Sequence, residues 1–87
     1  MFVEIYGRLS CPYCVRAKNL AEKMKNELAD FDFKFIDMIA EGMEKKDLEP
    51  RVGNTVETVP QIFIDDKAIG GCTDFQALVK QQFGISL

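Results

Sequence analysis

The chain has 87 residues, of which 47% are hydrophobic and 29% are charged, a composition typical of globular proteins and not of disordered ones. This length suits one domain, so we expect residues 1–87 to form a single unit. The formal net charge of -3 argues against a general nucleic-acid-binding protein, whose surface would be basic.

The N-terminal residues predict no targeting segment. Glu4 and Arg8 precede any long apolar run, so we expect neither a secretory signal nor a membrane anchor. An odd count of three cysteines also suits a secreted disulfide scaffold poorly. We therefore predict the reducing cytoplasm as the compartment.

The first 37 residues predict a strand, a helix and a second strand. Residues 2–7 are rich in β-branched and aromatic side chains and end at Gly7, which indicates a strand. From Pro12 to about Leu28, apolar residues recur at steps of three and four, which predicts an amphipathic helix. Residues 31–37 alternate phenylalanine with polar residues, which is typical of a strand. This order favours a right-handed βαβ unit with parallel strands.

The middle of the chain is more polar. Residues 41–52 contain few apolar side chains and predict a short surface helix, which we expect Pro50 to end or kink. A loop then runs from Gly53 to Pro60.

The C-terminal part predicts a hairpin and a helix. Residues 61–65 and 67–71 are expected to be strands joined by a turn at Asp65-Asp66. Thr73 and Gln76 match a capping box, with Thr73 as the N-cap of a last helix. The apolar face of this helix comprises Phe75, Leu78, Val79 and Phe83. The element order is β-α-β-α-β-β-α, which predicts an α/β fold with a mixed four-stranded sheet.

Two of the three cysteines, Cys11 and Cys14, stand at the start of the first predicted helix. Pro12 suits the first helical position, so Cys11 falls at about the N-cap, where free backbone N–H groups and the helix dipole favour a thiolate. Cys14 lies on the same side within the first turn and is more enclosed. This asymmetry predicts an exposed attacking thiol and a sheltered resolving thiol, the pair that thiol–disulfide exchange needs.

A cysteine pair at this spacing could also hold a metal, form a structural disulfide or simply be buried. A zinc site needs four ligands, but the chain has no histidine and one further cysteine, Cys72. A structural disulfide is unusual in a cytosolic domain. Two ordinary buried cysteines without chemistry are the remaining alternative, which the placement at a helix start makes less favoured.

The CPYC motif after a first strand and Arg8, Thr58-Val59-Pro60, and a Gly-Gly pair followed by Cys72-Thr73-Asp74 together resemble the glutaredoxins, in particular small dithiol glutaredoxins of bacteria and phages. The resemblance covers essentially the whole chain. It implies a thioredoxin fold with helices on both faces of the sheet. It also implies that Cys11 is the nucleophile and Cys14 the resolving cysteine, with no tightly bound cofactor, no metal, and glutathione as the reducing co-substrate.

The resemblance further implies a set of substrate-binding residues. Pro60 would be a cis-proline, against the alternative of an ordinary trans-proline, and would hold the backbone of Thr58 and Val59 extended beside the sulfurs. Thr73 and Asp74 would receive a carboxylate and the α-amino group of glutathione, unless they only cap the helix.

For three further positions of the implied site, a binding role stands beside an interpretation without any binding. Gly71, with Gly70, would allow a ligand to approach the backbone closely, or would simply form a turn. Tyr13 would stack on the bound tripeptide, or remain exposed. Arg8 would attract an anionic client, or be a solvated surface charge.

Cys72 departs from the family pattern, because close relatives often carry a tyrosine there. It places an aromatic contact to the ligand in doubt and brings a third thiol near the site. Cys72 is interpreted as a small packing residue or as a secondary redox switch.

We predict a monomeric, glutathione-dependent oxidoreductase that reduces protein disulfides by a dithiol route and glutathione mixed disulfides by a monothiol route. Disulfide-containing protein clients are the expected partners, with ribonucleotide reductase as a candidate by resemblance only, and neither nucleic acid nor membrane is expected as a partner. One alternative is a thioredoxin-like reductant that a reductase recharges. Another is an iron–sulfur carrier that uses Cys11 and glutathione as ligands.

Overall fold

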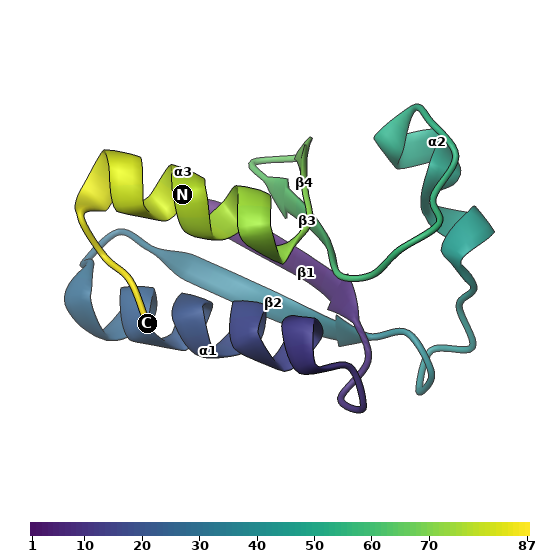
Figure 1. The fold of residues 1–87 in the computed structure, drawn as a ribbon, viewed down its shortest axis with the longest axis horizontal. Helices are drawn as coiled ribbons and strands as arrows, with labels where there is room; N and C mark the ends of the chain where they lie inside the picture. The colour runs from purple at the N-terminus through teal and green to yellow at the C-terminus, as the bar shows by residue number, and fades with distance from the viewer.

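The computed structural model describes all residues from 1 to 87 and contains one mixed four-stranded sheet (Figure 1). Its strands are β1 (Phe2–Gly7), β2 (Asp32–Asp37), β3 (Gln61–Ile64) and β4 (Lys67–Gly70). They lie in the order β2-β1-β3-β4. β1 pairs with β2 in parallel and with β3 in antiparallel orientation, and β3 pairs with β4 in antiparallel orientation. The predicted mixed sheet of four strands is therefore confirmed.

The hairpin between β3 and β4 turns where the sequence predicts. Asp65 and Asp66 have φ angles of 48° and 70°, the left-handed pair that a two-residue hairpin turn requires. The side chain of Asp65 also accepts a hydrogen bond from the N–H of Phe2, at 2.8 Å. Both strands end one residue earlier than predicted, because the pairing stops at Ile64 and Gly70.

Helix α1 spans Pro12–Glu27 and begins as predicted, with Cys11 at the N-cap and Pro12 in the first turn. One stripe of small and apolar side chains is buried, because these residues recur every three or four positions. The stripe consists of Cys14, Ala17, Leu20, Ala21 and Met24.

Helix α3 spans Cys72–Phe83, and its N-cap is Gly71. The prediction of Thr73 as N-cap was wrong, because the helix starts earlier and places Thr73 inside the first turn. The carboxylate of Asp74 accepts a hydrogen bond from the N–H of Gly71 at 3.0 Å, so Asp74 has the part predicted for Gln76. Within the predicted apolar face, Phe83 lies at the end of the helix and remains 37% exposed.

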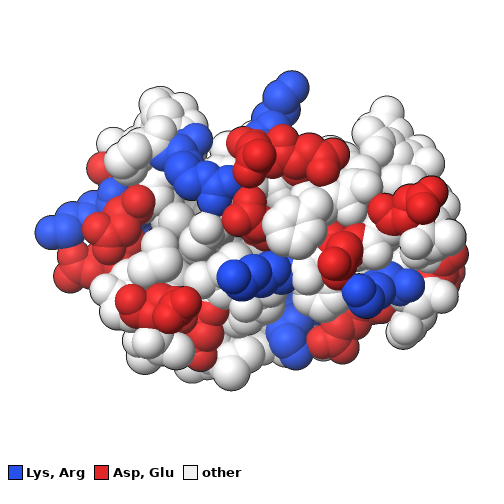
Figure 2. Space-filling view, turned by 180° about the vertical axis from the view of Figure 1, so that it is seen from behind, with Lys and Arg blue, Asp and Glu red and all other residues white.

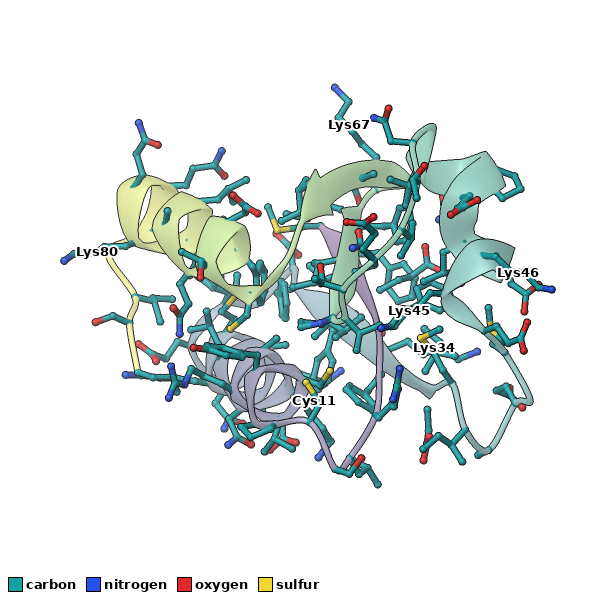
Figure 3. The ribbon with its side chains drawn as sticks, turned by 45° about the vertical axis from the view of Figure 1, so that its right-hand side comes forward. Cys11, Lys34, Lys45, Lys46, Lys67 and Lys80 are labelled. Carbon is teal, nitrogen blue, oxygen red and sulfur yellow. The ribbon has the colours of Figure 1, made fainter.

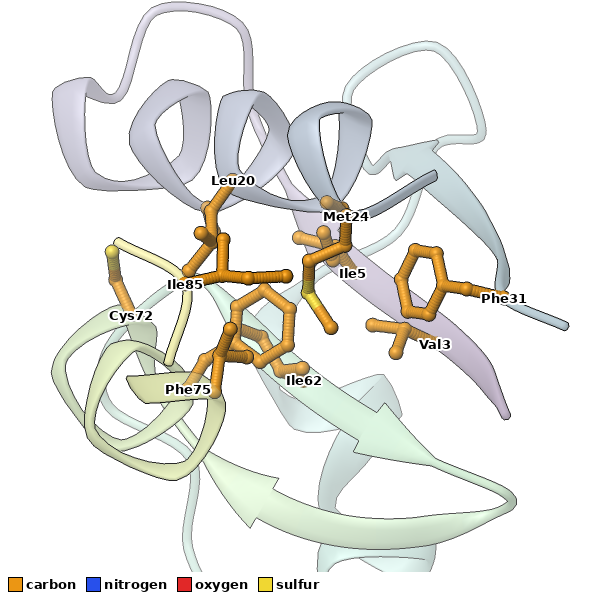
Figure 4. Packing of buried hydrophobic residues seen from close by; sticks show 12 residues of the cluster. Val3, Ile5, Leu20, Met24, Phe31, Ile62, Cys72, Phe75 and Ile85 are labelled. Atoms are coloured by element: carbon orange, nitrogen blue, oxygen red, sulfur yellow. The ribbon is translucent and has the colours of Figure 1, made fainter. Parts of the chain in front are cut away.

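The main core lies between the sheet and the two long helices, which cover the same face (Figures 1 and 4). Leu20 of α1 and Phe75 of α3 have no exposed surface, and Ile85 of the C-terminal tail closes the gap beside them. Burying each large apolar side chain contributes about 1.5–3 kcal/mol. This packing fixes α1 relative to α3.

The second face of the sheet is covered at one end by a 3-10 helix, η1 (Lys45–Leu48), followed by α2 (Glu49–Val52). The segment packs through a smaller cluster formed by Met38, Leu48 and Val56. The predicted helix over 41–52 therefore begins later, and Pro50 does not end it. Pro50 stands in the first turn of α2, where a missing N–H leaves no hydrogen bond unmade.

Two properties of the whole chain complete the description. None of the helices has both the length and the apolar character that crossing a membrane requires. Figure 2 shows acidic and basic side chains interspersed over the face turned away from the viewer of Figure 1.

Candidate active site

Cys11 lies at the N-terminal end of α1 (Figure 3). Its Sγ accepts a hydrogen bond from the N–H of Cys14 at 3.3 Å. It also lies 3.8 Å from the carbonyl oxygen of Val59, to which a thiol can donate. The side chain is half-buried, so a substrate sulfur can reach it.

The surroundings of Cys11 favour its thiolate. Burial alone raises the pKa of Cys11, but hydrogen bonds from the Cys14 thiol, from the N–H groups of Cys14 and Tyr13, and the charge of Arg8 outweigh it. The pKa of Cys11 is therefore below the ordinary value of a thiol. No acidic residue occupies the first turn of α1 to oppose this effect. The direction agrees with the expectation for a cysteine at a helix N-cap.

Cys14 has the opposite character. It has no exposed surface, and burial, together with the hydrogen bond to Cys11 and the charge of Cys11, raises the pKa of Cys14 to about 12. A Cβ atom at Gly7 would lie 2.6 Å from the Sγ of Cys14, so the absence of a side chain at the end of β1 makes room for this thiol. The two sulfurs are thus unequal in both access and acidity.

An open cavity of about 230 Å³ adjoins the cysteine pair. Eight of the nine predicted substrate-binding residues line it: Tyr13, Thr58, Val59, Pro60, Gly71, Cys72, Thr73 and Asp74. Arg8 does not line it but borders a separate cavity of about 410 Å³, which Met43 and Lys45 also line. The structure therefore brings Tyr13 next to two segments, 58–60 and 71–74, that follow it by about 45 residues or more in sequence.

Val59 presents its backbone to this cavity. The bond between Val59 and Pro60 is cis, as the resemblance implies. The N–H of Val59 donates to no group of the protein, so both its N–H and its carbonyl can pair with an extended peptide.

The start of α3 forms the opposite wall. Thr73 and Asp74 are exposed there, beside the free N–H groups of the first turn, which suits an anion. Gly70 has a φ angle of 109°, and a side chain at this position would collide with the carboxylate of Asp74. Capping by Asp74 and ligand binding at the same helix end are compatible.

The remaining residues at the cavity differ in exposure. Tyr13 is 57% exposed, and the guanidinium of Arg16 lies 5.4 Å from the centre of its ring. Cys72 is only 4% exposed, and burial and the nearby Cys11 raise its pKa, while Arg16 opposes this. A shielded, protonated thiol favours the packing interpretation of Cys72 over a redox switch.

Two features of this region are not predicted by the sequence. Met43 and Lys45 border the cavity of Arg8, although residues 41–52 gave no signal beyond that of a surface helix. Glu49 hydrogen-bonds the loop that leads to Val59, a contact between residues seven positions apart that no local pattern indicates. No set of three or more cysteine or acidic side chains is arranged to hold a metal ion.

Comparison with known proteins gives a consistent result. The Glutaredoxin family model matches residues 3–69. The chain is 69% identical to a glutaredoxin of Haemophilus influenzae over 85 residues, which cover 98% of each protein. It is 59% identical to glutaredoxin 1 of Salmonella typhimurium over 85 residues, again 98% of each protein. The solved structure of reduced Escherichia coli glutaredoxin matches with a TM-score of 0.87 and 54% identity, covering 98% of this chain and 100% of the other.

These matches confirm the thioredoxin fold and the predicted oxidoreductase activity with glutathione as the reductant. The family model spans most of the chain, and the relatives match it over nearly their whole length. The chain belongs to the glutaredoxin family of glutathione-dependent disulfide oxidoreductases.

Proposed function

We propose that Cys11 is the nucleophile and Cys14 the resolving thiol of this activity. In the dithiol route, the Cys11 thiolate attacks one sulfur of a client disulfide, and the other client sulfur leaves as a thiolate. Cys14 then loses its proton and attacks the Cys11 sulfur, which releases the second client thiolate and forms the Cys11–Cys14 disulfide. Two glutathione molecules reduce this disulfide and leave as glutathione disulfide, so the electrons balance.

The unequal access of the two thiols, together with their unequal acidity, supports this assignment. Cys11 is the accessible thiol with the lowered pKa, which suits attack on an incoming disulfide. The hydrogen bond to Cys11 and its charge are two of the causes that raise the pKa of Cys14. Both are lost once Cys11 is part of a mixed disulfide, so the pKa of Cys14 falls at the step in which its thiolate is needed.

In the monothiol route, Cys11 takes glutathione from a mixed disulfide and a second glutathione removes it. The cavity beside the sulfurs supports this route, because it offers groups complementary to a tripeptide. Val59 would pair with the cysteinyl backbone, the N–H groups of Thr73 and Asp74 would receive a carboxylate, and the Asp74 side chain would receive the α-amino group. Tyr13 and Gly71 would bound the ligand, with Thr58 and Pro60 holding Val59.

Serine variants of the cysteines test the assignment. Cys14→Ser is expected to keep deglutathionylation of a peptide and to lose reduction of a protein disulfide, because only the second reaction needs a resolving thiol. Cys11→Ser is expected to lose both activities. Equal loss of both activities in Cys14→Ser would contradict the scheme. Supplying thioredoxin reductase in place of glutathione tests the thioredoxin-like alternative in the same assay.

We further propose that the protein acts as a monomer in the cytoplasm on protein clients with disulfides. The odd count of three cysteines suits a reducing compartment better than a secreted disulfide scaffold, which supports the proposed location. Ribonucleotide reductase is a candidate client by resemblance alone. Turnover of that enzyme with this chain as the sole electron donor would support the candidate, and no turnover would remove it.

A further inference from the structure

One side chain of helix α2, Arg51, makes polar contacts with the second face of the sheet, in addition to the packing of Val52 on the cluster of Met38, Leu48 and Val56. The guanidinium of Arg51 donates hydrogen bonds to the carboxylate of Glu4 and to the hydroxyl of Tyr6, both at 2.9 Å. It also lies 4.0 Å from the centre of the Phe63 ring, within the range of a cation–π contact. Although α2 has only four residues, it is therefore anchored to β1 and β3.

The loop that follows α2 is tied back to a single residue of that helix. Of the amide groups from Gly53 to Val59, two donate hydrogen bonds within the protein, and both donate to Glu49. The N–H of Gly53 donates to the Glu49 carbonyl at 2.8 Å, and the N–H of Val56 donates to its carboxylate at 3.0 Å. Figure 1 shows this loop running from α2 across to β3.

The bond to Val56 lies three residues before the backbone that faces the sulfurs. Val56 is buried against Met38 and Leu48, and Val59 packs on the same cluster. The carbonyl of Val59 in turn lies 3.8 Å from the Sγ of Cys11. The Glu49 carboxylate is half-buried, and a hydrogen bond to a charged acceptor is stronger than one between neutral groups.

We propose that Glu49 is a positioning residue, whose carboxylate fixes the loop from Gly53 to Pro60 so that Val59 presents its backbone to the substrate. The inference rests on the proposed role of Val59 and extends it to a residue outside the cavity. The loop has few other hydrogen bonds, so its order at the site depends on Glu49 and on the packing of Val56. The reactivity of Cys11 does not depend on Glu49, because its hydrogen-bond donors belong to α1.

The experiment compares three variants of the full chain in the glutathione-coupled assay, with a glutathionylated peptide as the varied substrate. Glu49→Ala removes the acceptor of the Val56 N–H, and Glu49→Gln keeps a side-chain oxygen at the same reach. Glu57→Ala is the matched control, since it removes an exposed carboxylate of the same loop that forms no hydrogen bond. Amide hydrogen exchange at Val56 reports on the hydrogen bond directly.

Glu49→Ala is expected to raise KM for the peptide about fivefold, with kcat and the pH dependence of Cys11 alkylation unchanged. Glu49→Gln is expected to restore KM to near the wild-type value, and Glu57→Ala to match the wild type. Exchange at Val56 is expected to be slow in the wild type and in Glu49→Gln, and faster in Glu49→Ala. A purely structural role would not produce this separation of KM from kcat.

A wild-type KM in Glu49→Ala would overturn the proposal. So would equal losses of kcat and thermal stability in both Glu49 variants, because these would assign Glu49 to general stability. Rapid exchange at Val56 in the wild type would overturn it without any substitution. If the wild type showed no glutathione-dependent turnover, the proposed function would fail instead, and the exchange data would still decide the hydrogen bond.

Discussion

Substitutions of Asp74 should separate its capping of α3 from its proposed contact with glutathione. Asp74→Ala removes the hydrogen bond to the Gly71 N–H and a negative charge from the first turn of the helix. Loss of a capping acceptor costs about 0.5–2 kcal/mol. Loss of the charge at the helix N-terminus costs a further amount of about 0.3–1 kcal/mol. Asp74→Asn keeps an oxygen acceptor, so we expect it to lose mainly the second contribution.

The two variants are therefore expected to differ in stability and to agree in binding. At about 4–8 °C per kcal/mol for a chain of this size, Asp74→Ala should lower Tm by about 3–24 °C, and Asp74→Asn by about 1–8 °C. Both variants lose the proposed ion pair with the ammonium group of glutathione. An exposed ion pair is worth about 0.2–1 kcal/mol, so KM for a glutathionylated peptide should rise about 1.4- to fivefold in each.

Thermal unfolding and steady-state kinetics on the same preparations provide the test. Thr73→Ala is the comparison for stability, because Thr73 lies inside the first turn and should not cap the helix. A Tm lowered more by Thr73→Ala than by Asp74→Ala would refute the assignment of the cap to Gly71 and Asp74. An unchanged KM in Asp74→Asn would refute the ammonium contact.

Two further predictions concern pH. Arg8→Ala should move the pH midpoint of Cys11 alkylation upward, because the charge of Arg8 is one of the causes that lower the pKa of Cys11, and an unmoved midpoint would exclude that contribution. The pKa of Cys14 is about 12 in the folded protein against an ordinary value of 9.0, so the unfolded chain releases this proton first as the pH rises. The free energy of unfolding should therefore fall from pH 9.0 toward pH 12, and it should fall less in Cys14→Ala. Equal slopes in denaturant titrations of the two proteins would contradict the raised pKa.

The start of α1 was predictable because its signals are local. Cys11, Pro12 and the apolar spacing that follows lie within a few residues of one another, and each favours the same helix start. The turn at Asp65-Asp66 was predictable for the same reason. Neither the prediction of the start of α1 nor that of this turn depends on a contact with residues far away in the sequence.

The start of α3 was predicted wrongly because two overlapping patterns fit the sequence. Gly71 with Asp74 and Thr73 with Gln76 both have the spacing of a capping pair. The tertiary structure decides between them. Gly70 leaves β4 with a positive φ, and Gly71 packs against the backbone of Pro60, so the helix can begin at Cys72.

The role of the segment around α2 was also not predictable from local patterns. Arg51 hydrogen-bonds Glu4 and lies over the ring of Phe63, and Glu49 accepts a hydrogen bond from Val56. The contacts that position this short helix therefore join it to other elements of the fold. A polar stretch with sparse apolar residues carries no sign of such partners. Its helical bounds are correspondingly the least accurate of the prediction.

The proposed chemistry depends on the placement of two helix N-termini at one cavity. α1 begins beside this cavity at its N-cap, Cys11, and the first turn of α3, with Thr73 and Asp74, lines it. The N-terminus of α1 therefore favours a thiolate, and the N-terminus of α3 favours a carboxylate. Both helices lie on the same face of the sheet, and their separation is set by Leu20, Phe75 and other core residues. A close-packed core resists small displacements, so the distance between the two anion-favouring helix ends is a property of the core. The loop from Gly53 to Pro60, in contrast, packs on the second face of the sheet and has few hydrogen bonds besides those to Glu49. Substitutions in this loop or at Glu49 should therefore shift the position of Val59 more easily than substitutions in the core shift the two helices.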